Sequence, residues 1–235
     1  MITEPCVIAE DELIPAWRAA AELLLHDGER FNLVVHVRKP ESLNESDLRR
    51  YDARCFDSAV KQSVYDVANT IFPKIRRQHP TDLDNFFDYF VKVYERGQRW
   101  HPHVWGVYFL RLTRWGNRQI NQLSQIIQAI QSWKPRSRAA FVVHLSAADY
   151  DAPRTMGAPC LQYGEFIRNE NTTLSLIAVY RLHDYFHRAL GNLAGLTRLL
   201  RFVCQHTGLE SGTLTCLSAY AFLQCSKTQM RKLLQ

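Results

Sequence analysis

The chain has 235 residues, of which 46% are hydrophobic and 22% charged, a balance typical of a folded globular protein. Its net charge of +6 is modest, and it carries no zinc-finger or RNA-recognition signature, so we do not expect a nucleic-acid-binding protein. No apolar run approaches the roughly 18 residues of a membrane-spanning helix, so no membrane association is expected.

The cysteines and the first residues bear on the compartment. The six cysteines lie far apart and form no CxxC pair, so they do not indicate a disulfide framework. The start of the chain has neither the basic segment nor the apolar core of a secretory leader. We therefore expect a cytoplasmic protein with reduced thiols.

The N-terminal third is predicted to contain two helices and one strand. Apolar residues at helical spacing predict a helix over residues 15–25, and a β-branched run predicts a strand over 31–37. The polar stretch 41–50 is expected to be a loop. Helical spacing returns over 58–71, and a basic connection follows at 74–80.

Two further helices and a strand are predicted in the middle of the chain. An aromatic stripe over 81–94 predicts a helix that packs into the core, and residues 119–133 show the clearest amphipathic spacing. A strand is predicted over 139–144. The irregular aromatic stretch between the two helices contains His101 and His103, but no acidic or cysteine partner stands at ligand spacing, so no metal site is expected.

The C-terminal part is predicted to open with a β-hairpin. Strands over 161–168 and 174–181 flank a turn at 169–172. The remaining predicted elements are a helix over 192–206, a short strand over 213–217 and a basic helix over 222–234. Because no repeat or linker divides the chain, residues 1–235 are expected to form a single α+β domain.

Cys160 is the first candidate for chemistry. It follows Pro159 at the start of a predicted strand, where a stiff backbone can aim the sulfur. The thiolate is the reactive form, and it requires a nearby positive charge or helix end. Taken alone, Cys160 could be a nucleophile or an apolar structural cysteine, and its residue type favours the structural interpretation.

Four polar residues near Cys160 in the sequence also have two interpretations each. Arg181 and Asp184, at the end of an apolar strand, could form a structural ion pair, or could be an anion-binding arginine and a carboxylate facing a cleft. Asn192 could cap a helix or hydrogen-bond the edge of a base. Arg138 could be a surface residue or a phosphate ligand. Their joint order decides among these interpretations.

That order resembles thymidylate synthase and its relatives, the pyrimidine-nucleotide hydroxymethylases, over about half the chain. The matching motifs are Val107–Trp115, Asn121–Leu123, Pro135-Arg-Ser-Arg138, Ala158-Pro159-Cys160, Arg181-Leu-His-Asp184-Tyr-Phe186 followed by Asn192, and Gly208–Gly212. The short start and the missing long insert look more like the archaeal and cytidylate-hydroxymethylase branch than the bacterial enzyme.

The resemblance implies a fold and an activity. The fold would be a thymidylate-synthase-like mixed β-sheet flanked by helices, with sheets packing together in a homodimer. The enzyme would transfer a one-carbon unit, methyl or hydroxymethyl, from 5,10-methylene-tetrahydrofolate to C5 of a pyrimidine nucleotide through a covalent adduct on Cys160.

The resemblance also implies a role for each matching residue. Cys160 would attack C6 of the ring, while Arg181 would lower the pKa of the thiol and hold the phosphate. Arg138 would reach that phosphate across the dimer interface, and Asn192 would hydrogen-bond the pyrimidine. The remaining residues are Tyr108 on the proton-transfer side, Asp184 facing the pterin, Tyr220 on the substrate side and Trp105 on the folate side.

Several positions depart from the family pattern around the phosphate and ribose. Leu182 replaces a serine, Ala139 an arginine and Arg188 a glycine, and the segment 219–222 lacks the family's histidine and tyrosine. Each lost charge-assisted hydrogen bond costs about 1.5–3 kcal/mol. Ordinary deoxyuridylate is therefore expected to bind poorly unless compensating residues replace them, for which the candidates are Arg136, His183 and Arg188.

Two alternatives to the pyrimidine-nucleotide reaction stay open. The same fold and nucleophile could act on another, non-phosphorylated heterocycle in a specialised pathway, or the chain could be a non-catalytic paralogue that binds a nucleotide or a partner. The N-terminal catalytic glutamate of the family has no clear equivalent, and Glu29 and Glu95 are the candidates.

Overall fold

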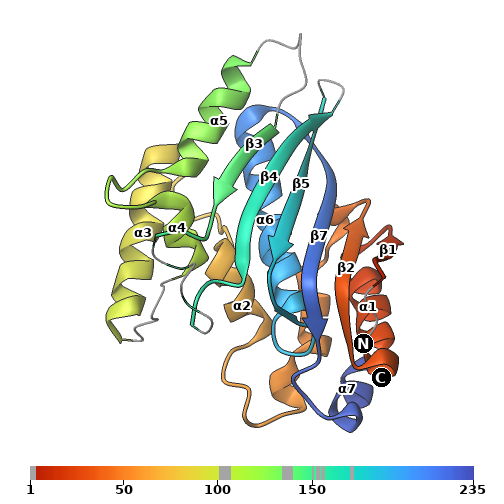
Figure 1. Cartoon of the computed structure of the whole chain (residues 1–235). Coiled ribbons are helices and arrows are strands. Elements are labelled where there is room, and N and C mark those ends of the chain that lie inside the picture. The colour runs from red at the N-terminus through yellow and green to blue at the C-terminus, as the bar shows by residue number, and fades with distance from the viewer. Residues whose placement is uncertain are drawn as a thin grey trace.

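The computed structural model describes residues 4–100, 107–133, 140–149, 151, 154, 157–169 and 172–235. Its centre is a seven-stranded mixed sheet, in which β6 pairs with β7. The other six strands follow the order β1-β2-β7-β5-β4-β3 (Figure 1). The strands are β1 Cys6–Glu10, β2 Glu29–Val37, β3 Ala140–His144, β4 Leu161–Asn169, β5 Thr173–Tyr180, β6 His183–Asp184 and β7 Glu210–Phe222. The predicted α+β class and mixed sheet are confirmed.

The pairing directions follow from the connections. β3, β4 and β5 pair antiparallel, as expected for a hairpin and its neighbour, whereas β5 and β7 are parallel because a long helix connects them. β2 pairs antiparallel with β7 and parallel with β1. β7 therefore has partners along both edges and lies between β2 and β5.

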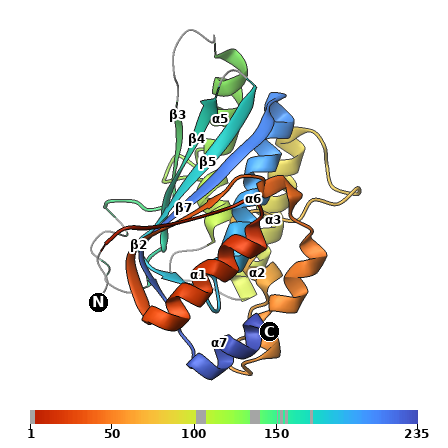
Figure 2. The same cartoon turned by 90° about the vertical axis from the view of Figure 1, so that its right-hand side faces the viewer.

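The helices lie on one face of the sheet (Figure 2). They are α1 Leu13–Asp27, α2 Val64–Ile71, α3 Leu83–Trp100, α4 Tyr108–Thr113, α5 Gln122–Ser132, α6 Ala189–Thr207 and α7 Lys227–Leu234. α6 is buried along most of its length. No helix in the described part of the chain is both long and apolar enough to span a membrane.

α2 packs closely on the N-terminal half of α6 because two α6 residues have no side chain. A Cβ added at Gly191 would lie 2.6 Å from Val67 Cβ, and one at Gly195 would lie 2.7 Å from the carbonyl oxygen of Ala68. Any larger residue would push the helices apart. This contact places α2 beside the segment that follows β5.

Several predicted boundaries were wrong. The stretch 41–50 is not a loop, because it contains two 3-10 helices, η1 Pro40–Ser42 and η2 Glu45–Tyr51, and a third, η3 Ala53–Cys55, follows. α2 begins only at Val64, because Ser63 and Asp66 form a capping box that starts the helix there.

The C-terminal boundaries also differ from the prediction. α6 begins at Ala189, before Asn192, so the helix-cap interpretation of Asn192 was wrong. β7 has 13 residues instead of the expected five, because β2 and β5 extend it from both sides. Phe222 therefore ends a strand, and the last helix starts at Lys227.

Candidate active site

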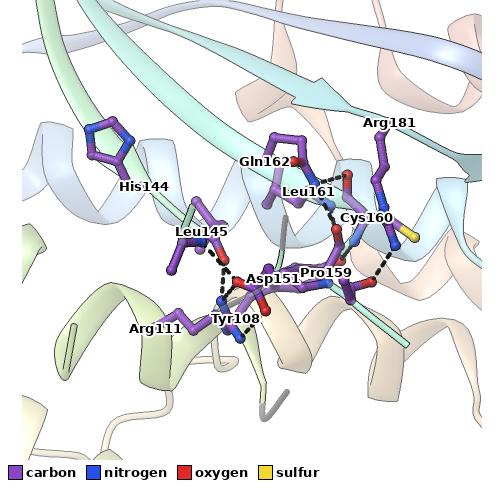
Figure 3. Close-up of polar contacts among 12 residues, drawn as sticks. Tyr108, Arg111, His144, Leu145, Asp151, Pro159, Cys160, Leu161, Gln162 and Arg181 are labelled. Carbon is purple, nitrogen blue, oxygen red and sulfur yellow. Dashed lines mark hydrogen bonds and ion pairs between the residues drawn. The ribbon is translucent and has the colours of Figure 1, made fainter. Parts of the chain in front are cut away.

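Cys160 immediately precedes β4 and is half-buried, as expected for a residue at the start of a strand (Figure 3). The hydroxyl oxygen of Tyr108, the first residue of α4, accepts hydrogen bonds from the backbone N–H groups of Cys160 and Leu161, both at 3.1 Å. On the other side, the N–H of Arg181 donates to the carbonyl of Cys160 at 2.9 Å. The backbone around the sulfur is thus held by two separate elements.

A second contact from α4 holds the segment that leads to Cys160. The guanidinium of Arg111 donates to the carbonyl of Leu145 at 2.7 Å and to both carboxylate oxygens of Asp151, whose side chain is 1% exposed. Burial disfavours the charged carboxylate, but the hydrogen bond and charge of Arg111 outweigh it and lower the pKa of Asp151. Tyr108 and Arg111 together fix both ends of this segment to one helix.

The Arg181 side chain lies beside the Cys160 thiol (Figure 3). Its guanidinium donates to the carbonyls of Ala158 and Arg154, both at 3.2 Å. Burial raises the pKa of Cys160, while the charge and hydrogen bond of Arg181, with a smaller effect of Arg188, act in the opposite direction. The net pKa stays above the ordinary value, so the arginine reduces the shift without reversing it.

Asp184 does not pair with Arg181, so the interpretation of these two residues as a structural ion pair was wrong. The Asp184 carboxylate accepts from the backbone N–H groups of Phe186 and Gln224, at 3.0 and 3.1 Å, and from the backbone and ring Nδ1 of His187. The carboxylate organises the turn between β6 and α6. His187 was not predicted, although its position three residues after Asp184 is a spacing at which such pairs form.

Asn192 lies in the first turns of α6 and is 6% exposed. Its Nδ2 is 3.1 Å from Nε2 of His183, whose Nδ1 is 2.9 Å from Oγ of Ser218. The ring of His183 stacks on Tyr180 with 4.0 Å between centroids. Burial lowers the pKa of His183 to about 3, so the imidazole is neutral near pH 7 and holds the amide of Asn192 by a hydrogen bond.

These residues meet around one hollow, which we call the Cys160 cavity. It has a volume of about 340 Å³ and is lined by Tyr108, Cys160, Asp184 and Asn192, and by two of the three residues named as compensating candidates, His183 and Arg188. Phe222, from the segment 219–222 that stands where the family has a histidine and a tyrosine, also lines it. Gln62, Val67 and Thr70 from around α2, and Gln224 after β7, line it too and were not predicted. No local motif identifies them, because only the packing of α2 and β7 brings them to the cavity.

Arg188 is the one arginine among the described residues that line the Cys160 cavity, and its guanidinium donates to the side chain of Gln62. Asp184 is the one carboxylate among them. A second hollow of about 620 Å³, the Lys61 cavity, adjoins the first and shares four lining residues with it, Gln62, Asp184, Arg188 and Gln224.

Other predicted residues lie elsewhere. Tyr220 is not among the lining residues of the Cys160 cavity; its hydroxyl donates to Glu29 on β2. Glu95 forms an exposed ion pair with Arg114. Trp105 and Arg138, together with His101, His103 and Arg136, fall outside the described residues.

Comparisons with known proteins identify a family. Residues 45–230 match the sequence model of the family described as thymidylate synthase. A protein of Methanococcoides burtonii named "Putative thymidylate synthase" is 30% identical over 117 residues, which cover 49% of this chain and 51% of that protein. One of the same name from Methanosarcina mazei is 30% identical over 115 residues, 48% of this chain and 50% of that protein. The match thus spans about half the length of these relatives. Since the family match extends over most of the sequence, the chain belongs to the thymidylate synthase family.

Proposed function

We propose that the chain transfers a one-carbon unit, methyl or hydroxymethyl, to C5 of a pyrimidine nucleotide through a covalent adduct on Cys160. Family membership supports the reaction class. The observation that carries the proposal is that Cys160, Asn192 and Asp184 line one cavity. They come from three different parts of the fold, and together they supply a nucleophile, an amide for the ring edge and a carboxylate.

Cys160 performs the covalent step. Its thiolate adds to C6 of the ring, and the electron pair of the C5–C6 bond makes C5 nucleophilic. After C5 has gained the carbon and lost its proton, the Cys160–C6 bond breaks and the thiolate leaves. Since the pKa of Cys160 is raised, the thiol must lose its proton on binding substrate, and Arg181 stabilises the thiolate formed there.

Tyr108 and Asn192 orient the reactants. Because burial raises the pKa of Tyr108 strongly, its hydroxyl stays protonated and acts as a hydrogen-bonding group and not as a base. It aims Sγ by holding two backbone amides. Asn192, held by His183, offers its amide to the pyrimidine edge.

The residues present fit 5,10-methylene-tetrahydrofolate as the one-carbon donor. The Lys61 cavity adjoins the Cys160 cavity, so a donor there would lie next to the ring, and Lys61 and Arg188 supply positive charge for a carboxylate-bearing molecule. When bound, the folate supplies the carbon and, for a methyl product, the hydride. Asp184 lines both cavities, and contact with the pterin would replace its bond to His187.

A homodimer remains part of the proposal. The sheet face opposite the helices carries partly exposed apolar side chains at its centre, Val34, Ile177, Val179 and Leu217. Packing this face on a second copy would bury them and would allow Arg138 to reach the partner's site, as the family arrangement implies.

A non-phosphorylated heterocycle is the second candidate substrate. Leu182, which lines the Cys160 cavity, is 38% exposed and offers no hydrogen bond to a phosphate. Arg181 is directed to two carbonyls, which leaves Arg188 as the cation of the described lining. Both observations favour a substrate with less negative charge than a nucleotide.

Intact-mass measurement tests the proposal. The protein is mixed with 5-fluoro-deoxyuridylate and methylene-tetrahydrofolate, and we expect a covalent adduct that disappears in Cys160→Ala. No adduct, but tritium release from C5 of a free base or nucleoside, would support the second candidate. If neither occurs and the thiol reacts no faster than glutathione, the chain is not a catalyst. Thermal shifts with dUMP, dCMP and their nucleosides measure the phosphate contribution, since ligand at 100 times its Kd stabilises by about 2.7 kcal/mol.

A further inference from the structure

A separate hollow lies beyond the C-terminal end of α2. It has a volume of about 880 Å³ and lies between η2, the connection from α2 to α3, and the C-terminal half of α6; we call it the basic cavity. It shares no lining residue with the Cys160 cavity. The proposed one-carbon reaction therefore does not account for it.

The charge of the basic cavity is strongly one-sided. Its described lining contains five cationic side chains: Lys74, Arg76, Arg77, Arg198 and Arg201. Glu45 is the one carboxylate in that lining, and it already pairs with Arg198 at 2.6 Å and Lys74 at 2.8 Å. The cavity thus keeps a net positive charge, which favours an anion with several negative charges.

Arg198 is a buried cation, and its Nη2 donates to no acceptor among the described residues. Its side chain is 7% exposed. Nε donates to Glu45, and Nη1 donates to the Asn69 side chain at 2.8 Å and the Phe72 carbonyl at 3.3 Å, but Nη2 has no described partner. A buried guanidinium N–H without an acceptor is costly, and a bound anion would supply one.

Two further arginines are available at the rim. Arg76 and Arg77 are exposed, and their side chains form no ion pair or hydrogen bond with another residue in the described ranges. Arginine side chains bind phosphate oxygens in a two-pronged geometry. Arg198 at the base and this pair at the rim can therefore contact successive phosphates of one ligand.

Apolar side chains and rings form much of the remaining wall, beside polar ones such as Asn44 and Gln205, and the cavity is larger than phosphates alone require. Ile75 is 43% exposed, and the partly exposed rings of His79, from the α2–α3 connection, and His206, from α6, also line the cavity. His206 packs on Phe202 with 4.5 Å between ring centroids. The volume lies within the range of small-molecule sites. A planar base and a ribose would cover these groups.

We propose that the basic cavity binds a nucleoside di- or triphosphate, with its phosphates on Arg198, Arg76 and Arg77. Calorimetric titration of the full chain at low salt, with ATP and with sodium tripolyphosphate, tests this. We expect ATP to bind at least tenfold more tightly than tripolyphosphate, because the apolar wall contacts only the nucleoside.

Charge-reversal variants locate the binding. Arg76→Glu with Arg77→Glu is expected to raise the Kd of both probes at least tenfold, and since both side chains are exposed and unpaired the fold is retained. Arg231→Glu with Lys232→Glu, an exposed pair on α7 with the same change of charge, should leave the Kd within twofold.

Four results would overturn the proposal. They are no ATP binding up to 1 mM, equal weakening by both double variants, equal affinity for ATP and tripolyphosphate, or displacement of ATP by a short single-stranded RNA that binds more tightly. Displacement by RNA would assign the basic cavity to nucleic-acid binding. As an internal check, Arg198→Lys keeps the charge but removes Nη2, the donor assigned to the phosphate, and about fivefold weaker ATP binding is expected with unchanged circular dichroism.

Discussion

Replacing Tyr108 by phenylalanine tests how Cys160, the proposed nucleophile, is held. The change removes one oxygen that accepts from two backbone N–H groups, those of Cys160 and Leu161. A buried donor without an acceptor costs about 1–3 kcal/mol. Leu161 is buried, whereas Cys160 is half-buried and water can partly replace its bond. We therefore expect a loss of about 2–4 kcal/mol, or roughly 4–16 °C in Tm for a domain of this size.

Urea unfolding at pH 7 measures that loss, and tritium release from C5 of the substrate measures its effect on chemistry. Because a displacement of about 1 Å at a reacting atom can cost about 100-fold in rate, kcat/KM should fall by more than stability alone explains. Tyr220→Phe is the matched control: its hydroxyl makes one partly exposed contact with Glu29, so it should cost less than about 1 kcal/mol. A Tyr108→Phe protein within 0.5 kcal/mol of wild type would refute the structural role assigned to this hydroxyl.

Three other changes have clear expected outcomes. Asp151→Asn leaves the guanidinium of Arg111 buried without its carboxylate, so urea unfolding at pH 7 should show a loss of stability of about 3–5 kcal/mol. Because folding lowers the pKa of Asp151, the ion pair stabilises the fold fully above a pH of about 3.9. The stability difference between wild type and variant should therefore shrink as the pH falls through the folded pKa. Gly195→Ala brings a methyl group 2.7 Å from a backbone carbonyl oxygen of α2 and should lower the stability by about 1–3 kcal/mol in the same assay. The control is Gly97→Ala on α3, where nothing lies within 4 Å of the added methyl group, and it should stabilise the protein by about 0.5–1 kcal/mol. Equal effects of the two variants would contradict the close packing of α2 on α6. His183 has a pKa of about 3 in the folded state and 6.5 in the unfolded state, so unfolding takes up a proton between these pH values. The free energy of unfolding should therefore decrease as the pH drops from 6.5 towards 3, and His183→Gln should make this decrease smaller. If wild type and variant show the same pH dependence of the urea midpoint, a buried neutral imidazole is excluded.

The candidate site was predictable only where it is local in sequence. The motifs around Cys160, Arg181, Asp184 and Asn192 occur within a short stretch, and their order suffices to assign the family pattern. Gln62 lies far earlier in the chain, within no motif, and reaches the cavity only because α2 packs on α6.

The partners of the charged residues were also not predictable. The sequence allowed an Arg181–Asp184 pair, but the folded chain offers Arg181 two carbonyls, and offers Asp184 three backbone amides and His187. Backbone donors and acceptors exist at every position, so only their placement in space decides which of them a charged side chain meets.

The sequence by itself determined the α+β class, most helices and strands, and the order of Cys160 and the motif residues that follow it. It could do so because hydrophobic periodicity and short motifs depend on residues that are close in the chain. Only the tertiary structure decided the full length of β7, the two-residue strand β6, the early start of α6 and the convergence of five arginine and lysine side chains in the basic cavity. Each of these depends on contacts between distant segments: β7 is long because two strands pair with it, and the cavity is basic because η2, the α2–α3 connection and α6 meet there.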